Sequence, residues 1–489
     1  MSRFLRQFDG TGRVPRDVQK TALTWLEDNW ESSKLFVISA SVGSGKSAIA
    51  KAIQKVTGGA IVVPSNLLMR QYVTSYPKTN FLMGKTHYTC KSGLSCKDWV
   101  DVLSQPACPD CPYQQCRNQA AEGVPTVFNP MSMYYLARNK EFERPGVVIV
   151  DEAHELASLV LLLCGTRLRK SQYGFTDACT NEIYLAEWLK TTLKKLYKMQ
   201  ALYQKLGDYN KVSEVSDQIE TLSLTSAGLE EDNHNYAIWM DDGMHRGRKE
   251  KFLNIRPIRP PKFLVQKILK ANKVILLSGT ISHMDVQDLL GDTDYKFLDL
   301  PSPIPKENRA IYYRPAPFAM NYHTPPQKIA EQILEVIREN PGVNTLVHTT
   351  YSLSKELIKY MPEGTLYNKE DDKDAVLEKF KQQGGILLGS GMAEGIDLPG
   401  DLCRLNIIPK LLYPNLKDPV VQKRKAMQDG NDWYNIKTLM KLVQQAGRST
   451  RGESDYSKTF ILDSGAAWRI QQYASRLPRS FVEAIVWNK

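Results

Sequence analysis

The 489-residue sequence has no long hydrophobic run and no recognisable targeting segment. Its longest apolar stretch, around Leu159–Leu163, is far short of the roughly 18 residues that a membrane span needs. The first ten residues, MSRFLRQFDG, lack the apolar core of a secretory signal, so we expect a cytoplasmic protein with no membrane partner. Internal repeats and low-complexity tracts are also absent. The length exceeds what one hydrophobic core usually supports, which predicts two or three domains.

Basic residues outnumber acidic residues in the sequence. Lys and Arg total 64 against 53 Asp and Glu, which gives a net charge of +11. This excess favours a polyanionic partner, because basic side chains release the counterions condensed on phosphates, although a merely soluble basic protein has the same composition.

Five of the eight cysteines lie between Cys90 and Cys116. In a cytoplasmic chain such crowding indicates metal or thiol chemistry rather than disulfides.

Seven short β-branched segments predict buried parallel strands, and the helical or polar stretches between them are typical of an α/β sheet covered on both faces. Four of the segments precede residue 300 and three follow it. The proline-rich stretch Leu300–Pro305 lies between the two groups and predicts a linker, so we expect two α/β domains in tandem. The segments are Leu35–Ser39, Ala60–Val63, Val147–Val150, Val274–Leu277, Thr345–His348, Ile386–Leu388 and Leu405–Ile408.

One interval, from about 155 to 250, has little strand character. Apolar residues recur there at spacings of three and four on either side of a turn at Gly207–Asn210. This pattern predicts an all-helical insertion, built as an antiparallel helix pair, that projects from the first domain.

A glycine-rich loop follows the first predicted strand. From Ala40 it has the form A-x-x-G-x-G-K-S and contains Gly43, Gly45, Lys46 and Ser47. Glycines let backbone N–H groups close around phosphates, the lysine pairs with β- and γ-phosphate oxygens, and the serine hydroxyl ligates Mg²⁺. The helix expected from Ser47 adds the positive end of its dipole. The loop therefore predicts nucleotide binding.

An acidic pair, Asp151 and Glu152, directly follows the third predicted strand. Carboxylates at the carboxyl end of such a strand face the crevice in which open α/β sheets bind ligands. We expect Asp151 to hold Mg²⁺ through its water shell, and Glu152 to position and deprotonate the attacking water. His154 follows two residues later, and a cap on the next helix is an alternative role for it.

The second half of the sequence contains polar residues that could complete a nucleotide site with the phosphate loop and the acidic pair of the first half. Gln444, Arg448 and Arg451 form the pattern Q-x-x-G-R-x-x-R, in which two arginines on one helical face can reach phosphate oxygens across a cleft. Asp397 lies in the glycine-rich turn Gly389–Gly400 and can couple the nucleotide state to a nucleic-acid track. In the first half, Ser278–Thr280 resembles a motif that links hydrolysis to strand contact.

Three further segments complete the pattern. Gln19, in Arg16–Gln19, occupies the place of an adenine-reading glutamine, Gly84–Cys90 introduces the first cysteine of the cluster, and Ser302–Pro305 joins the two halves. With the motifs above, these residues resemble the superfamily 2 iron–sulfur DNA helicases of the XPD/DinG type over nearly the whole chain. His87 departs from that family, which usually has Asn at this position, and the helical insertion is short.

The resemblance implies two tandem RecA-like helicase domains, with a small metal-cluster domain and a helical arch inserted in the first. The implied division is 1–86, continued by 118–160 and 250–300, for the first motor domain, 87–117 for the iron–sulfur domain, 161–249 for the arch and 301–489 for the second motor domain. The implied activity is ATP-dependent, 5′→3′ movement of a monomer along single-stranded DNA, with unwinding of forked DNA.

The resemblance also implies a [4Fe–4S] cluster on four thiolates, for which five cysteines are candidates. Cys90 matches the leading position, the C-x-x-C pair of Cys108 and Cys111 brings two thiolates together, and Cys116 follows as in relatives. We therefore expect these four to be ligands and Cys96 to be the spare. The spacing alone fits Zn²⁺ equally well.

Two other functions fit the sequence. One is a translocase that remodels protein–DNA or RNA–DNA complexes without processive unwinding. The other is a nucleic-acid-binding module in which the ATP site acts as a switch. A pure switch has no need of Glu152 or of the two arginines, whereas the sequence does not separate the translocase from a helicase.

Overall fold

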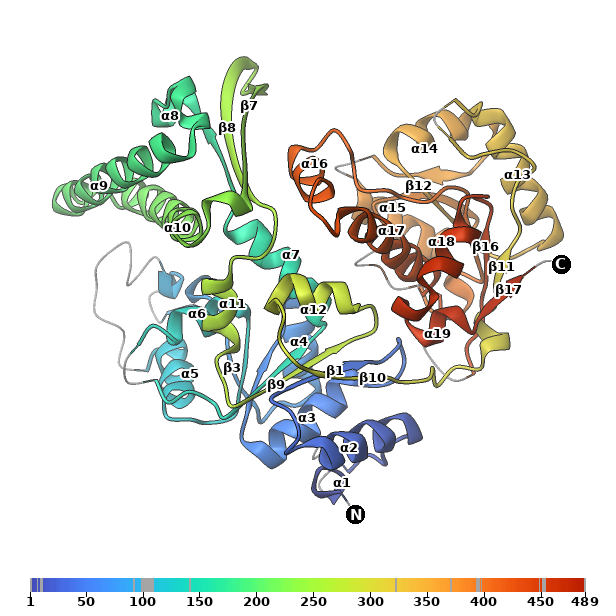
Figure 1. Cartoon of the computed structure of the whole chain (residues 1–489), viewed down its shortest axis with the longest axis horizontal. Helices are drawn as coiled ribbons and strands as arrows, with labels where there is room; N and C mark the ends of the chain where they lie inside the picture. Colours follow the sequence, from blue (N-terminus) through green and yellow to red (C-terminus); the bar gives the residue numbers. More distant parts are fainter. Residues whose placement is uncertain are drawn as a thin grey trace.

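The structure, a computed structural model, describes residues 2–6, 8, 12–90, 93–97, 110–139, 142–321, 323–369, 372–392, 396, 398–447, 449–450 and 454–487. Two seven-stranded sheets form the two halves of the molecule, and a smaller three-stranded sheet with two long helices projects from the first half (Figure 1). None of the described helices is both long enough and apolar enough to cross a membrane.

The first large sheet has the order β10-β1-β9-β5-β2-β4-β3, and all of its neighbouring strands are parallel. It contains the first four predicted strands, which are thereby confirmed, together with three short strands that were not predicted. The bounds are β1 Leu35–Ser39, β2 Ala60–Val62, β3 Asn80–Leu82, β4 Thr126–Phe128, β5 Val147–Asp151, β9 Lys273–Ser278 and β10 Lys296–Asp299.

Helices cover both faces of this sheet because alternate strand residues point to opposite sides. Val37 and Val148 face one core, formed with α6, α7, α11 and α12, whereas Ile38 and Ile149 face the other, formed with α1 to α4. The bounds are α1 Arg3–Arg6, α2 Asp17–Asn29, α3 Lys46–Thr57, α4 Asn66–Ser75, α6 Pro130–Leu136, α7 Ala153–Leu163, α11 Lys262–Leu269 and α12 His283–Leu290.

The second large sheet has the order β13-β14-β12-β15-β16-β11-β17 and is also parallel. It contains the last three predicted strands, and the Leu300–Pro305 segment, which has no helix or strand, joins it to the first sheet as expected. The bounds are β11 Ile311–Tyr313, β12 Thr345–Thr349, β13 Leu366–Tyr367, β14 Ile386–Ser390, β15 Leu405–Ile408, β16 Lys458–Ile461 and β17 Ile485–Trp487.

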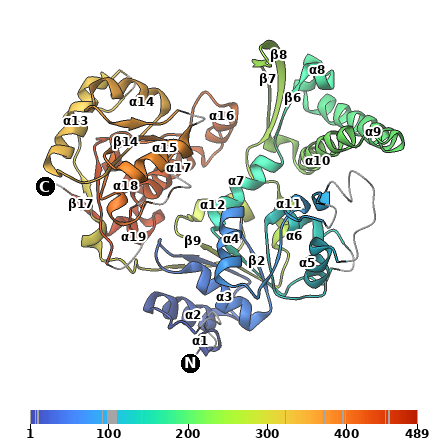
Figure 2. The ribbon, with the colours of Figure 1, turned by 180° about the vertical axis from the view of Figure 1, so that it is seen from behind.

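Helices also pack on both faces of the second sheet, where α17, α18 and α19 share one core and α13 and α14 share another. The helix α16 lies at the side that faces the projecting part of the first half (Figures 1 and 2). The bounds are α13 Pro326–Glu339, α14 Tyr351–Leu357, α15 Lys373–Gln383, α16 Pro419–Lys425, α17 Gly430–Ala446, α18 Ala466–Tyr473 and α19 Arg479–Val482.

The insertion contains the expected helix pair, α9 (Glu182–Leu206) and α10 (Tyr209–Glu231), but the prediction that it is all helical is wrong. The strands β6 (Thr166–Arg169), β7 (Tyr236–His245) and β8 (Arg248–Pro257) form an antiparallel sheet in the order β6-β8-β7. Apolar side chains of this sheet pack against the helix pair in one core, so the helices bury their inner faces against strands as well as against each other. A short helix, α8 (Lys170–Tyr173), follows β6.

Candidate functional site: a pocket between the two halves

The phosphate loop lies between β1 and α3, with its lysine at the first position of the helix. Gly45 has a φ of 77°, which L-residues with a side chain rarely adopt, and a Cβ there would lie 2.2 Å from Gln19 Nε2. Lys46 Nζ donates a hydrogen bond to Ala40 O (3.3 Å) and forms an ion pair with Glu152 Oε1 (3.2 Å). The loop therefore holds a lysine whose partner is the catalytic candidate Glu152.

Asp151 ends β5 and is almost fully buried. Its Oδ2 accepts hydrogen bonds from Ser47 Oγ and Tyr72 OH, each at 2.8 Å. Burial, together with the neighbouring charge of Glu152, raises the pKa of the Asp151 carboxyl. The side chains of Ser47 and Asp151, both expected to serve Mg²⁺, are therefore in direct contact.

Glu152 has a left-handed backbone, with a φ of 51°. Burial by itself opposes its ionisation, but the positive charges of Lys46 and His154 prevail and lower the pKa of Glu152 to about 2. His154 Nδ1 lies 2.8 Å from Ser278 Oγ and 3.5 Å from Glu152 Oε2. Burial alone lowers the pKa of His154, yet its contacts with Glu152 raise it above its ordinary value. His154 thus connects the acidic motif to β9.

Gln19 is buried and uses both ends of its amide within the protein. Its Oε1 accepts a hydrogen bond from Arg16 N (2.9 Å), and its Nε2 donates one to Gly45 O (3.3 Å). The Arg16 guanidinium also donates to Gly43 O. The segment expected to read adenine therefore also fixes the conformation of the phosphate loop.

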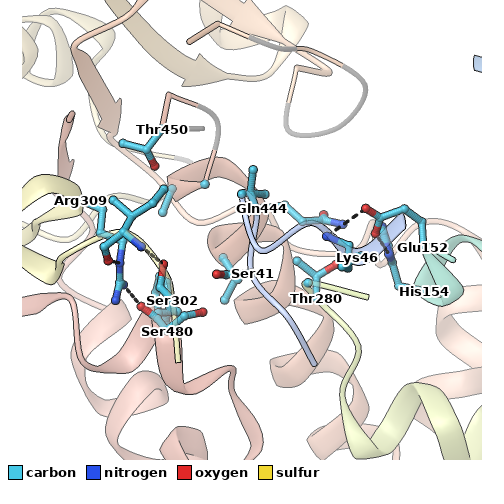
Figure 3. Close-up of a pocket in the computed structure, with 18 of the residues that line it drawn as sticks. Ser41, Lys46, Glu152, His154, Thr280, Ser302, Arg309, Gln444, Thr450 and Ser480 are labelled. Atoms are coloured by element: carbon cyan, nitrogen blue, oxygen red, sulfur yellow. Dashed lines mark hydrogen bonds and ion pairs between the residues drawn. The ribbon is translucent and has the colours of Figure 1, made fainter. Parts of the chain in front are cut away.

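Several residues of these motifs, Gly43, Lys46, Glu152 and His154, line a cavity of about 540 Å³ that is formed by both halves of the chain (Figure 3). Lys46, Glu152 and His154 gather at one side of it, and Arg309 and Ser480 at the other. The second half also contributes Gln444, Gly447 and Thr450 to the lining.

Two hydroxyl oxygens in this lining are buried and have no hydrogen-bond partner among the described residues, Ser41 Oγ and Thr280 Oγ1. A buried hydroxyl without a partner costs free energy, so such atoms are typical of a site that a polar ligand completes. The donors, the lysine and the pair of carboxylates together suit a nucleoside triphosphate with its Mg²⁺.

A second cluster forms where the cysteines crowd. An antiparallel bridge joins Thr89 to Ser95, and Cys96 N donates to Tyr88 O at 2.8 Å. The side chains of Cys90, Cys96 and Cys111 come within 4.8 Å of one another, and all three are buried.

The expectation that Cys96 is the spare cysteine disagrees with this grouping. Spacing along the chain could not show that this bridge brings the thiols of Cys90 and Cys96 together. Cys116, on α5 (Pro112–Ala121), is partly buried and packs against the group, and Cys108 lies outside the described residues. The remaining cysteines, Cys164, Cys179 and Cys403, are buried and are not part of the group.

The comparisons with known proteins agree with the two-domain geometry. A family model described as a helicase C-terminal domain matches residues 333–484. An ATP-dependent DNA helicase YoaA of Haemophilus influenzae is 26% identical over 56% of this chain and 46% of its own length. A probable ATP-dependent helicase of Methanocaldococcus jannaschii is 28% identical over 79% of this chain and 80% of its own length. A solved structure of an XPD helicase matches 97% of this chain and 99% of its own, with a TM-score of 0.64 at 15% identity.

The chain is thus similar to bacterial ATP-dependent helicases named YoaA and DinG, and it has the fold of an XPD helicase. A DinG helicase of Mycobacterium tuberculosis is 21% identical over 52% of this chain and 42% of its own length. The chain thus spans about half the length of these bacterial relatives, and the structural match shows the two RecA-like motor domains as a fold.

Within this fold the structure brings together most of the expected nucleotide-site residues, Gln19, Gly43, Gly45, Lys46, Ser47, Asp151, Glu152 and Gln444. Arg448, Arg451 and Asp397 lie outside the described residues. Sequence reasoning missed Arg309, whose guanidinium donates to Ser480 O and to Ile304 O and pairs with Glu483 at 2.6 Å. Its only sequence signal is its position just after the linker.

Proposed function

We propose that the chain is an ATP-dependent DNA helicase that moves along single-stranded DNA in the 5′→3′ direction and unwinds duplex DNA. The observation that carries the proposal is the shared cavity, in which Lys46 and Glu152 of one motor domain face Gln444 of the other. A ligand held by both domains couples its own hydrolysis to their relative movement. Its relatives are named ATP-dependent helicases, and the direction follows from the family resemblance.

The contacts suggest how the residues act. Lys46 is paired with Glu152, so a γ-phosphate that takes Glu152's place beside Lys46 leaves the Glu152 carboxylate free to orient and deprotonate water. Ser47 and Asp151 would hold Mg²⁺, which supplies neutralising charge at the phosphates when bound. Arg448 and Arg451 would complete the site from the second domain, and Asp397 would relay the nucleotide state to the DNA.

We propose that the cysteine group holds a [4Fe–4S] cluster, as the resemblance implies. The donor set fits a metal, because Cys96 Sγ and Cys111 Sγ lie 3.6 Å apart in a buried site. Burial and the neighbouring Cys111 raise the pKa of Cys96 to about 12, so thiolates at this place need a bound cation. Cys90, Cys96 and Cys111 would supply three ligands and Cys108 or Cys116 the fourth.

We also keep the proposed division of the chain into motor domains at 1–86, 118–160 and 250–300 and at 301–489, an iron–sulfur domain at 87–117 and an arch at 161–249, except that the arch extends to residue 257, because β8 pairs with β6 and β7. With this organisation, single-stranded DNA would pass between the motor domains and the two insertions, and the duplex would be split beside them. The proposed protein acts as a monomer in the cytoplasm.

The test is Lys46→Ala, with Lys55→Ala as the matched control. Lys55 is an exposed lysine on the same helix, at its far end. Loss of a charge stabiliser at the reacting phosphate lowers turnover by about 10²–10³-fold, so DNA-stimulated ATP hydrolysis should fall by that factor in Lys46→Ala only. Circular dichroism should show both variants folded. Normal turnover in Lys46→Ala would contradict the nucleotide assignment.

Strand displacement on 5′- and 3′-tailed duplexes of DNA, RNA and hybrid then separates the candidate functions. The proposal predicts ATP-dependent displacement on the 5′-tailed DNA. ATP hydrolysis without displacement would favour the remodelling translocase, and nucleic-acid binding without hydrolysis would favour the switch.

A further inference from the structure

The strands β7 and β8 form a long hairpin that extends away from the first motor domain (Figures 1 and 2). They pair without interruption from Tyr236 and Pro257 at the base to His245 and Arg248 at the tip. The base belongs to the core of the insertion, where Leu253 and Ile255 are fully buried against the helix pair. The outer end has no apolar core of this kind: Met244 near the tip is 65% exposed, and His245 contacts the guanidinium of Arg169 on β6. The hairpin is thus firmly held at one end and presents its other end to solvent.

The turn at the tip has an unusual backbone. Its two central residues are Arg246, with a φ of 49°, and Gly247, with a φ of 79°. A two-residue turn of this kind favours Asn, Asp or Gly at the first position, because other side chains are strained there. Arg246 and Glu152 are the only residues other than glycine with a positive φ in the part of the chain that the structure describes. Glu152 lies in the nucleotide site, and such strain is most often retained where a side chain has a function.

The tip also carries positive charge that the protein does not neutralise. Arg246, Arg248 and Lys249 are exposed, and their side chains form no ion pair among the described residues. Two of the three acidic residues of the hairpin contact the body of the insertion, and the third, Asp242, is exposed opposite Lys251. Asp241 pairs with Arg167 at 3.0 Å, and Glu250 Oε1 accepts a hydrogen bond from Ser171 N at 3.3 Å.

Contacts across the domain interface brace the base of the hairpin. Lys423 Nζ, on α16 of the second motor domain, donates to Tyr236 O at 2.9 Å. Arg256, near the end of β8, pairs with Asp418 at 3.1 Å. A relative movement of the two motor domains therefore acts directly on the base of the hairpin.

From these observations we infer that the β7–β8 hairpin is a pin that contacts the phosphate backbone of duplex DNA at the fork. Cationic side chains at its tip suit phosphate oxygens, and a two-stranded ribbon is a shape that the major groove of B-DNA admits. The inference rests on the proposed helicase function and adds to it a contact with the duplex, distinct from the ATP site and from the single strand.

The main test replaces Arg246 by Asn, which adopts the left-handed conformation more easily and carries no charge. The variant Arg246→Asn should be at least as heat-stable as the wild type, because the backbone strain is relieved, and yet unwind forked DNA more slowly. Single-strand-stimulated ATP hydrolysis should be unchanged. This combination of equal or higher stability with poorer unwinding is not expected of a residue that only shapes a turn.

A second test measures the charge contacts themselves. In Arg246→Asn/Arg248→Gln/Lys249→Gln, the slope of log affinity against log salt for a forked duplex should fall by about 1 for each phosphate contact that is lost. Binding to single-stranded DNA should keep its slope. The control Lys55→Gln removes an exposed charge from α3 and should leave both slopes unchanged.

Three results would overturn the inference. They are an unchanged slope and unwinding rate in the triple variant, an equal loss of affinity for single strands, and a loss of single-strand-stimulated ATP hydrolysis. The last would place the hairpin in the motor cycle rather than on the duplex. A wild-type protein without DNA-stimulated ATP hydrolysis would instead contradict the proposed function, while binding to forked duplex could still support or refute the contact at the tip.

Discussion

Arg424 lies at the centre of a charged network that joins the two motor domains. Its side chain is only 1% exposed, and it pairs with Asp288 of α12 at 3.0 Å and with Asp429 at 2.6 Å. Arg259, two residues after β8, reaches the same two carboxylates at 3.3 and 3.1 Å. A neighbouring ion pair joins Lys437 to Asp285 at 2.6 Å, again across the interface. The network therefore couples the stability of the second domain to its contact with the first.

The prediction concerns Arg424→Met, which keeps most of the side-chain volume and removes the charge. Removing one partner from a buried ion pair costs about 3–5 kcal/mol, because the remaining charge stays buried without compensation. Asp288 is the affected group, since it is only 10% exposed. Arg259 still reaches both carboxylates, so we expect a loss of about 3 kcal/mol, at the lower end of that range.

Thermal unfolding measures the effect. A loss of about 1 kcal/mol lowers the Tm of a domain of 150–250 residues by about 2–4 °C, so the transition of the second motor domain should fall by about 6–12 °C. The control is Arg476→Met, which breaks an exposed pair with Asp432 (2.8 Å, 44% and 42% exposed). An exposed pair is worth at most about 1 kcal/mol, and the Tm of this control should change by less than about 4 °C.

The double variant Arg424→Met/Asp288→Asn tests whether the uncompensated charge of Asp288 causes the loss of stability. Burial raises the pKa of Asp288, which shows that its charge is costly at this place. Replacing it by a neutral amide should therefore recover part of the loss, so that the double variant is more stable than the sum of the two single losses predicts. A Tm of Arg424→Met close to that of the wild type, or strictly additive losses, would refute the reasoning.

The remaining predictions concern a buried lysine and the cysteine group. Burial lowers the pKa of Lys51 to about 8, so between there and its usual 10.5 the unfolded chain binds more protons than the native one. Over that range the stability of the wild type relative to Lys51→Met should rise with pH, and parallel profiles of Tm against pH would contradict this. Cys96→Ser should lose bound iron and visible absorbance as completely as Cys111→Ser does, whereas the isolated Cys164→Ser should retain both. Full iron content in Cys96→Ser would show that Cys96 is not a ligand. Zinc in a colourless wild-type protein would refute the iron–sulfur cluster.

The sequence predicts the centre of each sheet better than its edges. Strands such as β1 and β5 are fully buried in a parallel sheet, and this environment requires uninterrupted runs of β-branched and other apolar residues. Short strands such as β3 and β13, with three and two residues, leave no periodic signal of that kind. Their pairing depends on tertiary contacts with a neighbouring strand that the local sequence does not specify.

The candidate site likewise contains residues that the sequence could group and residues that it could not. Motif spacing was sufficient to group Lys46, Asp151 and Glu152, because each lies at the carboxyl end of a strand in one parallel sheet or in the segment that follows it. It could not identify Tyr72 as a hydrogen-bond partner of Asp151, since 79 residues separate the two and no motif connects them. It also could not group Cys96 with Cys90, because the close approach of the two thiols depends on the bridge between Thr89 and Ser95 and not on a C-x-x-C spacing.

The missed hairpin shows where sequence rules fail for a functional reason. The strongest signal for a two-residue hairpin is Asn-Gly or Asp-Gly between alternating apolar residues, and the chain has Arg246-Gly247 between His245 and Arg248 instead. A residue chosen only for the turn would be Asn, so an arginine in its place obscures the turn and adds strain. The same holds for Glu152, whose left-handed backbone no helix or strand rule predicts. Residues whose type does not suit their backbone conformation are expected at functional positions, where the side chain is required for its chemistry. On this argument, Arg246 is the described residue outside the nucleotide site whose replacement should reduce unwinding without loss of stability.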